Sequence, residues 1–171
     1  MISKRGQMKI SFGMIFSIIL IIIFLSFTFW GIKKFVGISN SVKIADFKDN
    51  LQEGVDSLWR GSKGSDTLEY NLPSKIEFIC FGNLLPPPEG PGAKGNFASI
   101  YEEVRWSFFE TENMFVYPTE AAEGLDATTI KHIDIDASTL EKNPLCFENR
   151  DGKITLTITK DYGDSLVTIS E

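Results

Sequence analysis

Residues 10–32 contain no charged side chain, and this run limits the fold of the chain more than any other feature of the sequence. A helix of that length is about 35 Å long, whereas the hydrocarbon core of a bilayer is about 30 Å thick. The run is apolar all around a helix, which is typical of a segment that faces lipid. Trp30 lies where an interfacial aromatic residue is usual, shortly before two lysines. The sequence therefore predicts a transmembrane helix over residues 10–34, preceded by a basic segment over residues 1–9.

The flanking charges indicate how the span is oriented. Lys4, Arg5, Lys9 and the α-amine precede it, and two lysines follow. Because basic residues are enriched on the cytoplasmic side, the N-terminus is expected in the cytoplasm and the C-terminal domain outside the cell membrane. The opposite orientation would place the domain in the cytoplasm, and nothing in its composition forbids that. A cleaved secretory signal is another alternative, but its apolar core is usually only about 7–15 residues long.

The charge of the rest of the chain argues against several functions. Residues 1–34 hold five of the 17 basic residues and none of the 23 acidic ones, so the remainder has a net charge of −11. A surface without a basic stripe is unsuited to a phosphate backbone, so no nucleic-acid partner is expected. One histidine and two cysteines leave little material for a metal site or an activated nucleophile. No glycine-rich phosphate loop, G-x-S-x-G or H-E-x-x-H motif occurs, so we expect no enzyme activity and no cofactor.

Residues 35–64 are expected to form an amphipathic helix and a linker. Apolar residues recur at helical spacing while charged residues fill the other side, and Gly61 with Gly64 ends the pattern. The apolar positions are Val42, Ile44, Phe47, Leu51, Val55 and Leu58. Whether this helix continues the membrane span is left open, because neither the glycine nor the serines of residues 37–41 forbid a single helix.

Residues 65–171 are expected to form an extramembrane α+β domain. Alternating or short apolar runs predict strands, and residues 98–109 have the spacing of a short helix. The proline-rich residues 86–95 predict an exposed loop. Asp151-Gly152 predicts a tight hairpin turn, because both central residues of a type I′ turn need positive φ, and the last three strands are expected to form an antiparallel meander. The predicted strands are residues 75–81, 114–117, 130–137, 145–148, 153–160 and 165–170. The fold class is therefore α+β, with an N-terminal transmembrane helix, an amphipathic helix and then a mainly antiparallel β domain.

His132, Asp134 and Asp136 alternate along one expected strand, so their side chains would project from one face, each within about 7 Å of the next. A histidine and two carboxylates could ligate a divalent ion. A polar strand face turned to water explains the same spacing, and no second cluster of ligands is visible. The three residues are metal candidates at most, and no metal site is predicted.

Cys80 and Cys146 share a local setting, since each lies on an expected strand and is followed by a phenylalanine. If the domain is external, they can form one disulfide, and closing that loop would stabilise the fold by about 4 kcal/mol on the chain-entropy model. The alternative is two buried thiols that behave as small apolar side chains.

The N-terminus carries a short motif, Lys4-Arg5-Gly6-Gln7, followed almost at once by the apolar helix. This motif resembles the class III signal of archaeal type IV pilin-like proteins, and the order of an apolar half-helix, an amphipathic half-helix and an antiparallel sheet resembles their architecture. The resemblance implies cleavage after Gly6, so that Gln7 would begin the mature chain. Two positions depart from the family, because Ser11 stands where an acidic residue is common and Lys9 where pilins are apolar or neutral. The chain is also similar to small single-pass membrane proteins of archaea, for which the resemblance implies no activity.

Two functions follow as expectations. The first is a single-pass membrane-anchored protein with an external interaction or structural domain. The second is a pilin-like subunit of a surface filament or secretion pseudopilus. The expected partners are membrane lipid and either further copies of the chain or other membrane or surface proteins.

Overall fold

The computed structural model describes residues 12–86, 88–107, 111–122 and 124–171. It is an α+β structure with one long N-terminal apolar helix and antiparallel sheets. The chain divides into two compact units, Met1–Ile38 and Ser39–Glu171. The expected basic segment of residues 1–9 lies outside the described residues.

Helix α1 covers Phe12–Arg60, so the glycine and serines of residues 37–41 do not interrupt it. In the first unit its large apolar side chains are exposed on every side. Ser17, Ser26 and Thr28 each donate to the carbonyl four residues earlier, at 2.8–2.9 Å, so these hydroxyl groups of the apolar run are paired within the helix. By length and composition the helix is able to cross a membrane.

The second half of α1 belongs to the second unit and completes its main core. Ile44, Phe47, Leu51 and Val55 are buried there, at the spacing that predicted an apolar helix face. The Phe47 ring meets the ring of Tyr70 edge to face, with 5.0 Å between the ring centres. The segment expected as a helix and linker ahead of the domain is therefore part of the domain's core.

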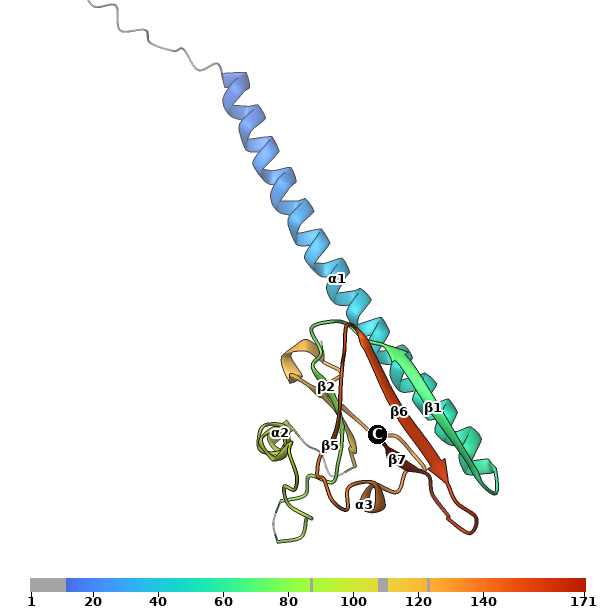
Figure 1. Cartoon of the computed structure of the whole chain (residues 1–171). Helices are drawn as coiled ribbons and strands as arrows, with labels where there is room; N and C mark the ends of the chain where they lie inside the picture. Colours follow the sequence, from blue (N-terminus) through green and yellow to red (C-terminus); the bar gives the residue numbers. More distant parts are fainter. Residues whose placement is uncertain (1–11, 87, 108–110, 123) are drawn as a thin grey trace, which may run out of the picture. The chain divides into compact units, whose positions relative to one another are not determined.

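A three-stranded antiparallel sheet lies beside this half of α1 (Figure 1). Its strands are β1 (Gly64–Asn71), β6 (Lys153–Lys160) and β7 (Thr168–Ser170), in the order β1-β6-β7. The isoleucines and leucine of β6 are buried in the main core while its threonines alternate with them on the outer face, the pattern of a sheet with one buried face. β1 has no counterpart among the predicted strands.

The second sheet is antiparallel and four-stranded, in the order β4-β3-β2-β5. Its strands are β2 (Phe78–Phe81), β3 (Met114–Tyr117), β4 (Ala127–Thr128) and β5 (Leu145–Glu148). Alternate side chains of β2, β3 and β5 enter the main core, and the others form a second cluster with helix α2 (Ala98–Val104). Burial on both faces explains why these strands are continuous apolar runs. The remaining elements are η1 (Arg105–Ser107), η2 (Thr119–Ala122) and α3 (Ile135–Ser138).

The predicted bounds of β3, β5 and β6 match the structure, whereas other elements are shorter. β2 begins at Phe78 instead of residue 75, because the chain turns at Pro73, whose carbonyl accepts a bond from the N–H of Ile76 at 3.1 Å. β7 begins at Thr168 instead of residue 165. The expected helix over residues 98–109 is α2 followed by the 3₁₀ turn η1, and its last two residues lie outside the described part of the chain.

The expected meander of the last three strands is confirmed for β6 and β7, which pair antiparallel, and is wrong for the hairpin between β5 and β6. Asp151 and Gly152 do have positive φ, 53° and 82°, as a tight turn requires. Only Arg150 and Lys153 pair across this turn, after which the two strands separate. β5 pairs with β2 in one sheet, and both edges of β6 are taken by β1 and β7 in the other.

Replacing Leu51 by Asp is expected to lower the free energy of unfolding by about 3–5 kcal/mol, because it places an unpaired carboxylate in the core. Leu51 is fully buried, whereas its neighbour Asn50 is exposed. Asn50→Asp adds the same charge one residue away and is expected to change stability by no more than about 0.5 kcal/mol. Chemical denaturation of both variants in detergent measures the difference, and equal stabilities would contradict the packing of α1 in the core.

Candidate functional site

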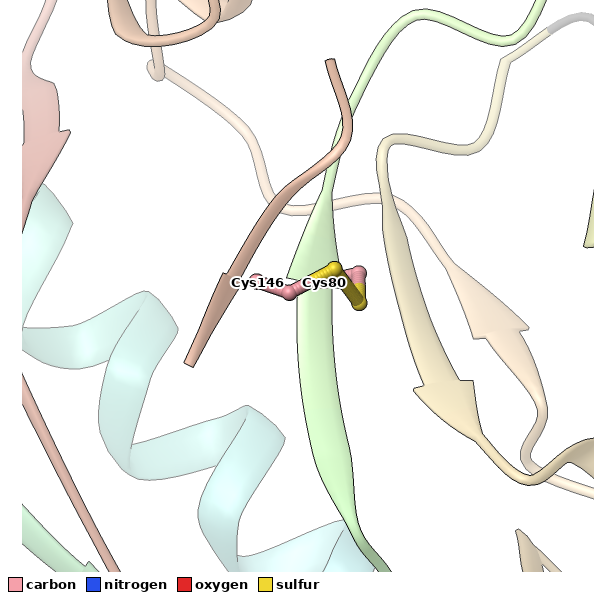
Figure 2. The surroundings of a disulfide bond; sticks show 2 residues. All are labelled: Cys80 and Cys146. Atoms are coloured by element: carbon pink, nitrogen blue, oxygen red, sulfur yellow. A yellow bond between two sulfur atoms is a disulfide. The ribbon is translucent and has the colours of Figure 1, made fainter. Parts of the chain in front are cut away.

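The two cysteines face each other on neighbouring strands. Cys80 of β2 and Cys146 of β5 are directly opposite in the antiparallel register, with 4.0 Å between their Cα atoms. That separation is inside the limit of about 7 Å beyond which no bridge can form without backbone movement. The structure joins them in a disulfide with an S–S distance of 2.06 Å, as Figure 2 shows.

The disulfide lies on the side of the second sheet that α2 covers. Both half-cystines are almost completely buried, at 0% and 3% exposure, in the cluster that contains Tyr101, Val104 and Phe115. The bond joins residues 66 positions apart, which gives the loop-closure contribution of about 4 kcal/mol expected from the sequence. Its burial suits a structural role, because exchange with another thiol needs access to a sulfur atom.

The metal candidates do not come together, because the strand expected over residues 130–137 does not form. Ile133 makes a single bridge to Val167, and the chain then enters α3. Asp134 caps that helix by accepting a bond from the N–H of Ala137 at 2.9 Å. This carboxylate therefore caps the start of α3. Among the residues it describes, no group of three or more His, Cys, Asp or Glu side chains could hold a metal ion.

Asp134 and Asp136 line an open surface hollow of about 320 Å³, whereas His132 turns to the other side, toward α1. The backbone of His132 is left-handed, with φ 66°, which breaks the alternation on which the expected strand face depended. Aspartate is one of the residues favoured at a helix N-cap, and this property of Asp134 is the sequence signal that could have indicated the short helix.

His132 belongs to a polar cluster with the last turns of α1, which the sequence did not predict. Its Nδ1 lies 2.8 Å from a carboxylate oxygen of Asp56, and its ring stacks on Trp59 with 3.7 Å between ring centres and 4° between planes. The hydrogen bond from His132 is the main cause that lowers the pKa of Asp56, burial opposes it, and the amide of Gln52 adds to the lowering. Arg60 contributes a smaller favourable charge.

Further polar contacts fix the end of α1 to the domain. Gln52 accepts from the N–H of Lys131 at 2.8 Å and donates to its carbonyl at 3.3 Å. Trp59 Nε1 donates to the carbonyl of Ser165 at 3.1 Å. Lys160, itself 8% exposed, donates to the carbonyls of Trp59 and Gly61 at 2.6 and 3.0 Å. A cation on the terminal carbonyls of a helix is favourable for both hydrogen bonding and the helix dipole.

No sequence signal could have revealed these contacts, because their partners are 76 to 106 residues apart along the chain. The contacts position a helix on a sheet. They present neither a nucleophile next to a base nor a convergent set of ligands. The processing candidates Gly6 and Gln7 lie outside the described residues.

Comparisons with protein-family models, with curated proteins and with solved structures found no match for this chain.

The lowered pKa of Asp56 predicts how stability depends on pH. Because its folded-state pKa is below the ordinary value of 3.8, the ionised carboxylate stabilises the fold above about that pH and loses this effect as pH falls through the folded-state pKa. The stability difference between the wild type and Asp56→Asn is therefore expected to shrink as the pH falls below 3.8. Urea denaturation across that range measures it. Asp49→Asn is the control, since that exposed carboxylate lies on the same helix without His132 beside it, and an identical pH dependence would contradict the prediction.

Cys80 and Cys146 are expected to be oxidised in protein taken from its native membrane. Thiol labelling under denaturing, non-reducing conditions should detect no reactive thiol, and reduction should release both. Cys80→Ser provides the control, because it leaves Cys146 free to react. Two reactive thiols in the unreduced wild type would remove the disulfide from the native protein.

Proposed function

We propose that the chain is a single-pass membrane-anchored protein whose unit Ser39–Glu171 is an external structural or binding domain. The observation that carries the proposal is the exposed apolar surface of the first part of α1. Its apolar side chains are exposed all around the helix, and none of its most apolar 18-residue window is buried in protein. An apolar surface of this size is far larger than water-exposed surfaces usually carry, and lipid is the solvent that suits it.

Three details of α1 support insertion in lipid. The hydroxyl groups of Ser17, Ser26 and Thr28 bond to the helix's own carbonyls, so these three polar groups are paired within the helix, as hydrocarbon requires. Trp30 is 62% exposed near the end of the run, as an interfacial aromatic would be. The ammonium group of Lys33 lies 4.9 Å from the centre of the Phe29 ring, which places the first charge beyond the run against an aromatic side chain.

Two independent arguments favour the external side for the domain. The basic residues before the span outnumber those after it, which favours a cytoplasmic N-terminus. The disulfide between Cys80 and Cys146 belongs to an oxidising compartment, because disulfides rarely persist in the cytoplasm. The proposed partners are membrane lipid and either further copies of the chain or other membrane or surface proteins.

The second candidate function is a pilin-like subunit of an archaeal surface filament or secretion pseudopilus. The observation that favours it is that the apolar run and the amphipathic half belong to one helix, α1, whose amphipathic half packs beside an antiparallel sheet. N-terminal sequencing of protein purified from membranes separates the two candidates. Gln7 as the first residue supports the pilin-like subunit, whereas an intact Met1 supports the anchor.

Removal of residues 1–41 is expected to release a soluble, folded domain, whereas the full chain should stay with the membrane fraction until detergent is added. The physical reason is that residues 42–60 complete the core while the preceding run is apolar on every side. Fractionation of both forms, with circular dichroism of the fragment, measures this. Full-length protein in the soluble fraction without detergent would contradict the membrane anchor.

A further inference from the structure

Strand β1 is an edge strand whose outer side is uncovered. Among the described residues it pairs with β6 alone, and the same register continues to Leu72, whose N–H donates to the carbonyl of Gly152 at 2.8 Å. Because hydrogen-bonded and non-bonded pairs alternate in an antiparallel ladder, the even-numbered residues of β1 bond to β6. The odd-numbered residues point their N–H and C=O groups away from the sheet. These are Ser65, Thr67, Glu69 and Asn71, and none of these backbone groups has a hydrogen-bond partner among the residues that the structure describes.

The opposite edge of the same sheet is covered. The N–H of Ile169 in β7 donates to the hydroxyl of Ser138 at 2.9 Å, and Ile133 bridges Val167 just before that strand. In the second sheet the edge strand β4 has two residues and β5 has four, against eight in β1. β1 therefore presents the longest edge in the described parts of the chain, and a strand of this length is long enough to guide another strand.

On both faces of β1 the side chains form a surface that an added strand could extend. On the inner face Leu68 and Tyr70 pack against the main core and remain half-buried, so a further strand would cover them. On the outer face the hydroxyls of Ser65 and Thr67 bond to those of Thr159 and Thr157 on β6 at 2.9 and 3.2 Å, which holds the strand in an ordered row. An added strand with apolar residues on one face and small polar residues on the other would extend both surfaces.

The negative charge on β1 favours a basic side chain on the added strand. Asp66 is exposed, lies on the same face as Tyr70 and has no ion-pair partner among the described residues, whereas Glu69 is paired with Lys153 at 2.6 Å. Burial first and the charge of Asp66 second raise the pKa of Tyr70 to about 12, so the negative potential of Asp66 reaches the edge of the core. The net charge of −11 beyond residue 34 also favours a basic partner.

A second copy of the chain does not suit this edge. A two-fold axis that paired two β1 strands antiparallel would bring two exposed Asp66 side chains, one from each copy, to the same pair of strands. Each copy also carries the net charge of −11 beyond residue 34, so two such edges repel each other, whereas a basic segment is attracted.

We propose that the outer edge of β1 binds an extended segment of another protein, which adds an antiparallel strand to the β1-β6-β7 sheet and places a lysine or arginine opposite Asp66. Backbone bonds to the odd-numbered residues supply affinity, and the alternating side chains supply selectivity. The inference goes beyond the proposed function, because it names a partner of stated chemistry for the domain. It does not require that the helix spans a membrane.

The test uses the full chain in detergent micelles and two short synthetic peptides of alternating valine and threonine, one with a central lysine and one with glutamate in its place. Hydrogen exchange is followed by mass spectrometry over residues 64–71. We expect the lysine peptide to slow exchange there and to bind about fivefold more tightly than the glutamate peptide. Asp66→Lys should reverse that preference.

Thr67→Pro is the matched control, because it removes one outward N–H while leaving the ladder to β6 intact. It should abolish the slowed exchange with only a small fall in melting temperature, which reflects the lost hydroxyl bond to Thr157. If it fails to fold, the Asp66→Lys reversal decides alone. Unaltered exchange with both peptides, or equal affinities in the wild type and in Asp66→Lys, would overturn the inference. Protection of residues 64–71 that grows with protein concentration in the absence of peptide would assign the edge to a second copy and overturn it as well.

Discussion

The burial of one face of α1 is the constraint on which the rest of the domain depends. Leu51 and Val55 are fully buried in the same core as the inward residues of β6, so the first sheet has no closed core without this helix. Apolar packing is non-directional and would tolerate sliding of the helix along the sheet. The polar contacts of Gln52, Asp56 and Trp59 with segments near the other end of the chain remove that freedom, because hydrogen bonds are made only in one register.

At the end of α1, polar contacts again fix the position of a helix that apolar packing holds on the sheet. The last carbonyls of a helix lack partners within it, and here a mostly buried lysine donates to one of them, on Trp59, and to the carbonyl of Gly61 just beyond the helix. Lys160 lies at the end of β6, so the strand at the centre of the first sheet also terminates the helix that covers it. One side chain thus connects the helix to the central strand of the first sheet.

Patterns within short stretches of sequence predicted much of this structure. The apolar run, the amphipathic face around Leu51, the strands β3, β5 and β6 and the matched settings of Cys80 and Cys146 all depend on local spacing or composition. β1 was missed because it is an edge strand whose large apolar side chains are only Leu68 and Tyr70, so its sequence contains no apolar run. Sheet membership was missed because the choice between β5 and β1 as the neighbour of β6 is made by contacts far apart in the chain. The segment around His132 alternates like a strand, but a left-handed residue and an N-cap convert it into a turn and a short helix.

The disulfide divides the domain into a covalent ring and two tails. The ring runs from Cys80 to Cys146 and contains α2, β3 and β4, together with the proline-rich residues 86–95. The strands of the first sheet, β1 before the ring and β6 and β7 after it, all come from the tails. A single cut in the loop of the ring would therefore leave one covalent molecule, held together by the bond between Cys80 and Cys146, whereas a single cut in either tail would produce two chains with no covalent link between them. The covalent topology thus keeps the half of the domain that carries its long loop in one piece after such a cut, and leaves the other half to rely on hydrogen bonds and packing alone.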